Sequence, residues 1–112
     1  MPIRKLRQYL LVLALLFSVI NYPNPFNPQG GEKATFSCSS DISAEATLYI
    51  YDMAAHLVSQ QPFTLNVGTN QQTWNGLTNA NELAGNGIYL YRLVNKTSRT
   101  SLGKGKIWII NK

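Results

Sequence analysis

The side chains that could carry out chemistry are few, and they do not cluster in the sequence. The 112-residue chain has one cysteine, one histidine and five carboxylates: Cys38, His56, Glu32, Asp41, Glu45, Asp52 and Glu82. A structural zinc site usually needs four ligands, and nucleophilic catalysis needs a nucleophile beside a base. A single cysteine also excludes a disulfide within the chain. The sequence therefore predicts no catalytic residues, no metal site, no cofactor and no small-molecule substrate.

The spacing of the reactive residues favours structural roles. Cys38 alternates with Phe36, which is typical of a small apolar residue in a strand, although an unpaired cysteine in an exported protein can also be reactive. His56 is expected to be solvated beside a turn. Asp52 is expected to cap that turn, because it lacks the neighbouring carboxylates of a calcium site.

The elements that must position these residues begin with a hydrophobic leader. Arg4, Lys5 and Arg7 precede an apolar run at residues 9–20, which is the pattern of a secretory signal peptide. As a helix, these twelve residues would be about 18 Å long, short of a bilayer core of ~30 Å. Residues 1–20 are thus predicted to be a signal peptide or N-terminal hydrophobic anchor that engages the inner membrane transiently. Ile20 is large for a cleavage position, so removal of the leader stays open.

The rest of the chain has the pattern of short β-strands. Alternating apolar residues separated by Gly, Pro, Asn and Asp predict strands at 33–39, 46–52, 56–65, 71–74, 88–95 and 104–110. No later segment has a sustained helical period. Residues 21–112 are therefore predicted to form one all-β domain, an immunoglobulin-like antiparallel sandwich of about seven strands, preceded by the short leader helix.

Alternation also predicts which side chains enter the core. Tyr89, Tyr91 and Leu93 should point inward, because Arg92 places its own face of the strand in solvent. Tyr89 could also form a hydrogen bond to the backbone at a strand corner. Trp74 and Trp108 are interpreted as core or inter-sheet aromatics, with a sugar-binding surface as the alternative.

The most unusual segment is Asn-Tyr-Pro-Asn-Pro-Phe-Asn-Pro at residues 21–28. Three prolines fix φ and remove backbone donors. The segment therefore cannot be a central strand, and should lie at a sheet edge or cross one end of the sandwich. Phe26 is the expected anchor.

This segment resembles the start of the C-terminal sorting domains of the type IX (Por) secretion system, in the variant related to the Ig-like domain of flagellar hook-capping proteins. Four further motifs agree in order: Leu-Tyr-Ile-Tyr-Asp at 48–52, Trp-Asn-Gly at 74–76, Gly-Ile-Tyr-Leu-Tyr-Arg-Leu at 87–93 and Lys-Ile-Trp-Ile-Ile-Asn-Lys at 106–112. The resemblance spans residues 21–112. It departs at Ala55 and Asn81, where the family often has glycine, and at Asn75 in place of aspartate. A left-handed turn at Ala55 would be costly.

The resemblance implies a non-enzymatic targeting role. Such a domain is exported to the periplasm and recognised by the outer-membrane secretion machinery, and its cargo then reaches the outer-membrane surface or the medium. The expected recognition residues are Pro23, Asn24, Pro25, Phe26, Asn27, Pro28, Gly87, Tyr89, Lys106 and Lys112. The alternatives are a free-standing extracellular structural or adhesive module binding protein or carbohydrate, a hook-capping assembly domain, and last a small enzyme.

Charge does not by itself indicate an anionic partner. The net charge is +5, but three of the ten basic residues lie in the leader. Six others follow residue 90: Arg92, Lys96, Arg99, Lys104, Lys106 and Lys112. They are interpreted as a solvated strand edge that resists sheet-to-sheet association, so no nucleic-acid partner is predicted.

Overall fold

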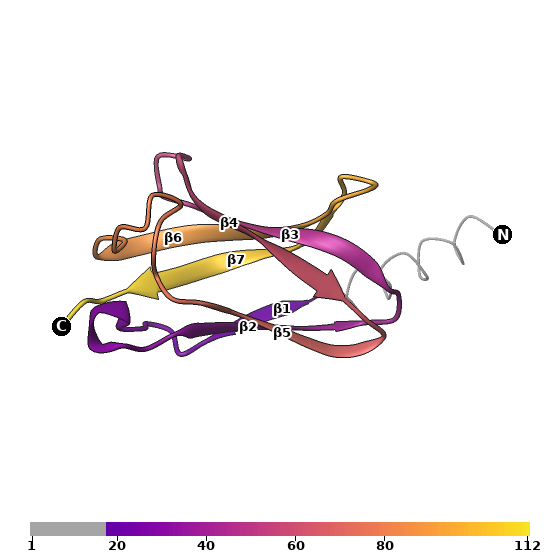
Figure 1. The fold of residues 1–112 in the computed structure, drawn as a ribbon, viewed down its shortest axis with the longest axis horizontal. Coiled ribbons are helices and arrows are strands. Elements are labelled where there is room, and N and C mark those ends of the chain that lie inside the picture. The colour runs from indigo at the N-terminus through magenta and orange to yellow at the C-terminus, as the bar shows by residue number, and fades with distance from the viewer. Residues whose placement is uncertain (1–17) are drawn as a thin grey trace, which may run out of the picture.

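The computed structural model describes residues 18–112, which form two antiparallel β-sheets packed face to face (Figure 1). The three-stranded sheet has the order β1-β2-β5, with β1 at Val19–Tyr22, β2 at Ala34–Ser40 and β5 at Gly68–Trp74. The four-stranded sheet has the order β4-β3-β6-β7, with β4 at Leu57–Leu65, β3 at Ala44–Tyr51, β6 at Gly87–Asn95 and β7 at Ser101–Ile109. A 3-10 turn, η1, spans Pro28–Gly30. The predicted immunoglobulin-like sandwich of about seven strands is confirmed.

The start of the domain differs from the predicted boundary. Residues 1–17 lie outside the described part of the chain, so the signal peptide and its helix stay predictions. Val19 and Ile20, assigned to the leader by sequence, belong to β1, where they lie opposite Cys38 and Ser37 of β2. Within residues 18–112, no helix has the length and apolar character needed to cross a bilayer.

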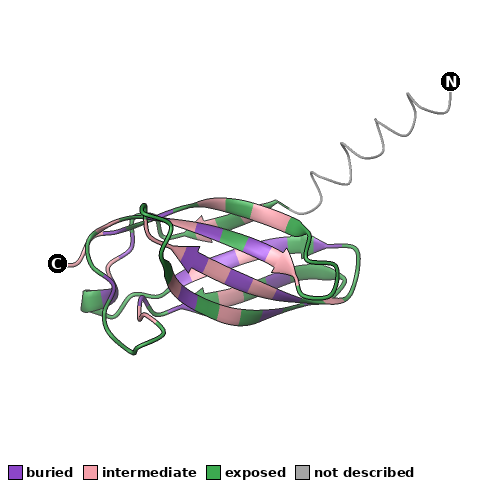
Figure 2. Ribbon diagram, turned by 90° about the horizontal axis from the view of Figure 1, so that it is seen from above, coloured by how far each residue is buried: buried purple, intermediate pink, exposed green. Residues whose placement is uncertain are grey.

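The alternation of the strands decides which side chains are buried (Figure 2). In β6, Tyr89, Tyr91 and Leu93 are buried as predicted, while the intervening side chains face outward. In β7, the buried residues are Ile107 and Ile109.

The two tryptophans differ in burial. Trp74 is in the core, as predicted. The prediction for Trp108 is wrong, because it lies between two inward residues of β7 and its side chain is 47% exposed. Alternation in a strand with one buried face overrides the general tendency of tryptophan to be buried.

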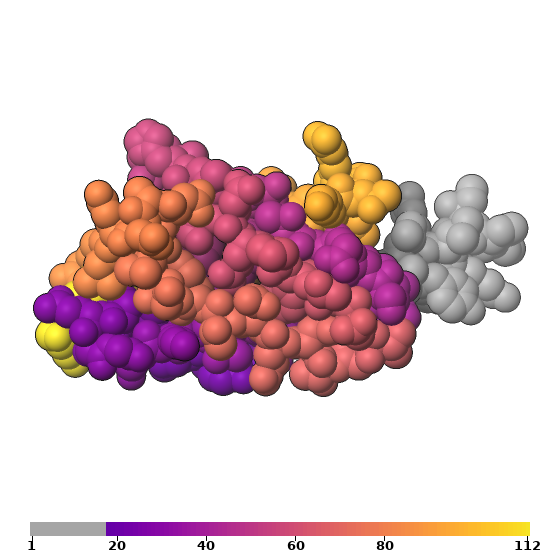
Figure 3. All heavy atoms as spheres, in the orientation of Figure 1, coloured from indigo at the N-terminus to yellow at the C-terminus, as the bar shows by residue number. Residues whose placement is uncertain are grey.

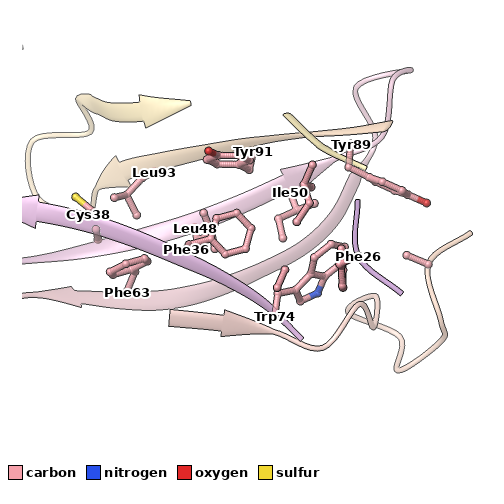
Figure 4. Close-up of a cluster of buried hydrophobic side chains, with 14 of the residues drawn as sticks. Phe26, Phe36, Cys38, Leu48, Ile50, Phe63, Trp74, Tyr89, Tyr91 and Leu93 are labelled. Carbon is pink, nitrogen blue, oxygen red and sulfur yellow. The ribbon is translucent and has the colours of Figure 1, made fainter. Parts of the chain in front are cut away.

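The core lies between the sheets and contains a chain of aromatic contacts (Figure 4). Phe26 packs against Trp74 with ring centroids 5.6 Å apart, and Trp74 meets Tyr89 edge-on at 6.3 Å. Phe36 and Tyr91 form a second edge-on pair at 4.8 Å. Edge-on pairs of this kind add about 0.5–1.5 kcal/mol beyond simple area burial.

A glycine in β7 leaves room for the Tyr91 side chain, which links β6 to β1. The Tyr91 hydroxyl is 2.9 Å from Asn21 Oδ1 and 3.2 Å from the Val19 carbonyl oxygen, so it fastens β1 to the facing sheet. A Cβ built on Gly105 would lie 2.5 Å from Tyr91 Oη. Any larger residue at position 105 would therefore displace this hydroxyl.

We expect Gly105→Ala to lower the free energy of unfolding by about 1–3 kcal/mol, because overpacking forces Tyr91 from its position. Urea denaturation of residues 18–112 measures the change. Gly85→Ala is the matched control, since a Cβ there meets nothing within 4 Å. Equal stability of the two variants would contradict the proposed role of Gly105.

The turn between β3 and β4 has the strain that the sequence suggested. Ala55 has φ +66°, and Asn81 in the later loop has φ +61°. Asparagine tolerates this left-handed region, whereas alanine does not.

Ala55→Gly should therefore raise the free energy of unfolding by about 0.5–1 kcal/mol, since relief of the left-handed strain exceeds the entropy that glycine adds to the unfolded chain. Thermal and urea unfolding give the sign. Ala54→Gly, one residue earlier and without positive φ, should lower stability instead. A loss of stability in both variants would be inconsistent with strain at position 55.

Candidate functional site

The contacts of the reactive side chains indicate structural roles. Cys38 is buried, and burial raises the pKa of its thiol. The Asp52 carboxylate accepts the backbone N–H groups of His56 and Ala54, each at 2.9 Å, and lies 3.1 Å from the exposed His56 ring. The His56 N–H is the main reason that the pKa of Asp52 lies below its ordinary value. The turn-capping interpretation of Asp52 is confirmed. Residues 18–112 contain no group of three or more potential metal ligands.

The proline-rich segment links the two sheets along one side of the sandwich. We call residues 23–28 the N-terminal strap. The strap leaves β1 in the three-stranded sheet, and Phe26 then pairs in parallel with Ile109 of β7 in the four-stranded sheet. The Phe26 N–H donates to the Trp108 carbonyl at 2.9 Å, and its carbonyl accepts the Ile110 N–H at 3.0 Å. The strap thus extends the four-stranded sheet by one short segment, and the predicted anchor Phe26 is buried.

Asn24 completes this pairing with its side chain. Its Oδ1 accepts the Trp108 N–H at 2.8 Å, and its Nδ2 donates to the Lys106 carbonyl at 3.3 Å. The Asn24 side-chain amide therefore binds the backbone N–H and C=O groups of β7 that a neighbouring strand would otherwise bind. The flanking Pro23 and Pro25 are exposed and have no N–H that would need a partner.

Asn27 and Pro28 connect the strap to two other motifs. Asn27 Oδ1 accepts the N–H of Gly30 and the N–H of Lys112, both at 3.1 Å. Pro28 is buried and lies against Gly76, which has φ +80° and where a Cβ would lie 2.4 Å from the proline ring. The glycine of the Trp-Asn-Gly motif therefore serves both a left-handed turn and a close contact.

The beginning of β6 and the residues after β7 meet the strap at the same end of the sandwich (Figure 3). Gly87 lies opposite Ile109. The Tyr89 hydroxyl donates to the Gly85 carbonyl at 2.8 Å, as predicted. Asn111 donates its N–H to Asn86 Oδ1 at 2.7 Å, and its own Oδ1 accepts the N–H of Gln29 at 3.2 Å. We call this end, with the strap, the strap end.

The strap end contains most of the recognition residues that the sequence predicts. Some of them contribute buried side chains to its structure, and others contribute backbone groups. Phe26 and Pro28 are interior anchors. Lys106 offers its carbonyl to the strap, while its side chain lies exposed on the opposite side of β7 from the core. Lys112 contributes its N–H. Sequence reasoning missed Asn111, because an isolated asparagine after a strand has no distinguishing pattern.

Comparisons with known proteins find similarity at the level of structure. No protein-family model matches the sequence, and no curated protein matches it. A crystal structure of dimeric latent PorU from Porphyromonas gingivalis matches 84% of this chain, with 26% identity and a TM-score of 0.70. PorZ, a surface component of the type IX secretion system of the same organism, matches 83% with 22% identity and a TM-score of 0.58. FlgD from Xanthomonas campestris, a protein of flagellar hook capping, matches 90% with 17% identity and a TM-score of 0.57.

The expected relation is confirmed. The solved structures that resemble this chain include both the Por proteins and the hook-capping protein to which the sequence motifs pointed. At 22% and 17% identity, the PorZ and FlgD likenesses concern the fold alone. The chain corresponds to 9% of PorU, 11% of PorZ and 73% of FlgD. It therefore matches a small part of each of the Por proteins.

Asn24→Ala should weaken the attachment of the strap. Loss of its two hydrogen bonds is expected to cost about 1–2 kcal/mol of unfolding free energy and to speed hydrogen exchange at the Trp108 amide. Asn66→Ala is the control, because the exposed Asn66 side chain makes no hydrogen bond to the described residues. Unchanged protection of Trp108 in Asn24→Ala would refute the bridging role.

Proposed function

We propose that this chain is a non-enzymatic secretion and targeting module of the type IX sorting-domain kind, recognised by the outer-membrane secretion machinery. The main support is the match of 84% of the chain to part of PorU at 26% identity and a TM-score of 0.70. PorZ, with the same fold, is described as an essential surface component of the type IX system. The module would cross the inner membrane by means of its leader, fold in the periplasm, and end at the outer-membrane surface or outside the cell.

The strap end provides a physical basis for recognition. Phe26 and Pro28 are buried, which holds the exposed Pro23, Asn24 and Pro25 as an ordered surface. A preorganised surface loses little conformational entropy when it is bound. Recognition would then depend on a folded surface, without covalent chemistry in the domain and without a metal, cofactor or nucleic acid.

A second candidate is a free-standing adhesive module. The observation that favours it is Trp108, which is 47% exposed and lies opposite Ile88 on the outer side of the four-stranded sheet. An exposed tryptophan can stack on a sugar ring or anchor a protein contact. Binding to glycan or cell-surface arrays that Trp108→Ala removes, with stability unchanged, would support this role.

The sorting role is tested by fusing residues 18–112 behind a signal peptide and a reporter in a bacterium with type IX secretion. We expect the reporter at the cell surface or in the medium. Lys112→Glu, at the exposed strap end, should reduce this export about tenfold, whereas Lys96→Glu, which reverses the same charge in the exposed turn between β6 and β7, should not.

The controls separate targeting from folding. A host with disabled type IX machinery should keep the reporter in the periplasm, and thermal unfolding should show that both lysine variants fold. A folded wild-type module whose reporter stays in the periplasm of the competent host would refute the sorting function.

A further inference from the structure

The outer face of the four-stranded sheet combines aromatic, aliphatic and basic side chains on three neighbouring strands. The pairing register places Tyr49, Arg92 and Lys104 in one row across β3, β6 and β7. It places Tyr51, Leu90 and Lys106 in the next row. These six residues are here called the outer patch. Tyr49, Leu90 and Arg92 each lie between two buried residues, and directly paired residues lie on the same face of a sheet, so all six share the solvent side.

The centre of the outer patch is apolar and hollowed. The Tyr49 and Tyr51 rings are stacked, with centroids 6.2 Å apart and an interplanar angle of 22°. An open hollow of ≈ 660 Å³ lies beside Tyr51, with Leu90 and Ala55 also among its lining residues. Such a hollow has the size of a binding pocket, but its open shape suits a side chain of a larger partner better than an enclosed small molecule.

The cations of the outer patch form no salt bridge with any of the described residues. Arg92 lies directly opposite Lys104, and like charges in this arrangement destabilise a sheet. Within residues 18–112, neither side chain forms a salt bridge. Protection of an open strand edge, the interpretation that the sequence favoured, does not explain Arg92, because β6 lies between β3 and β7 inside the sheet.

Both edges of this sheet are already partly covered. The strap pairs with β7. On β4, Asn79 binds the Val58 carbonyl at 2.9 Å and the Gln60 N–H at 3.1 Å. The next residue in that alternation is Pro62, which has no N–H to offer a partner strand. A partner is therefore expected to use the face of the sheet, and not to add a strand at its edge.

We propose that the outer patch binds an acidic segment of a partner protein. One apolar side chain of that segment enters the hollow beside Tyr51 and Leu90, and its carboxylates pair with Arg92, Lys104 and Lys106. Interface centres are rich in tyrosine and arginine, and anionic groups would remove the repulsion between Arg92 and Lys104. A nucleic acid is less well matched, because the floor is partly aliphatic and three cations neutralise few phosphates.

This inference goes beyond the targeting role and does not depend on it. The outer patch is a different surface from the exposed strap residues, and its binding is measured on the purified domain without a secretion system. Residues 18–112 contain the complete described core and both sheets. Failure of the reporter export would leave the binding result unaffected, and the reverse also holds.

The probe is a fluorescein-labelled peptide with a central Phe flanked by Asp and Glu, titrated with residues 18–112 at low and moderate salt. We expect saturable binding that weakens as salt rises, because exposed charges are screened. Arg92→Glu and Lys104→Glu should each weaken it about tenfold or more. Arg92→Glu also places an acid opposite Lys104, so this variant should remain folded.

The matched controls are Lys33→Glu and Arg99→Glu, which reverse an exposed charge away from the outer patch and should bind as wild type. A peptide with Gly in place of Phe should bind about tenfold more weakly. Three results would overturn the proposal: no saturable binding of the acidic peptide, equal effects of patch and control variants, or tighter binding of oligothymidylate than of the peptide.

Discussion

The structure depends on one short segment that forms hydrogen bonds with both sheets. β1 pairs with β2 in the three-stranded sheet, and a few residues later Phe26 pairs with Ile109 in the four-stranded sheet. This crossing fixes how the sheets lie against each other along one side, because backbone donors and acceptors must be satisfied at both ends of the segment. The burial of Phe26 against Trp74 and the polar bridges of Asn24 and Asn27 follow from that path.

The two outer surfaces of the sandwich have different chemistry. On β2 and β5 the three-stranded sheet presents hydroxyl and amide groups, with Thr35 opposite Thr73 and Ser37 opposite Gln71, and its β1 edge adds the exposed Ile20 and Tyr22. The four-stranded sheet presents the tyrosines of the outer patch and its three cations, which form no salt bridge within residues 18–112. Both sheets bury an equivalent face, so the core does not require this asymmetry. The location of these groups on one face is more informative than the net charge, to which Arg4, Lys5 and Arg7 outside the described residues also contribute.

Alternation made much of the fold predictable, as the inward side chains of β6 show. The predictions were wrong where another signal was followed instead of alternation. Val19 follows a long apolar run that only Ser18 interrupts, so the sequence places it in the leader although it lies in β1. Residue type places Trp108 in the core, although its neighbours Ile107 and Ile109 are the buried ones. The strap residues were found from their unusual composition. Their hydrogen-bond partners cannot be predicted in this way, because contacts between residues more than 80 positions apart, such as Asn24 with Trp108, leave no local pattern in the sequence.

The contact between the strap and β7 also constrains the order in which parts of the domain can fold. Asn24 and Asn27 meet partners 82 to 85 residues later in sequence, so their loops close only when the last strand is present. Loop closure over such separations makes folding slow. A chain delivered from its N-terminus would therefore lack the bridges of Asn24 and Asn27 until β7 and Lys112 had emerged. The native surface at the strap end can therefore form only after the last residues of the domain are available to bind the strap.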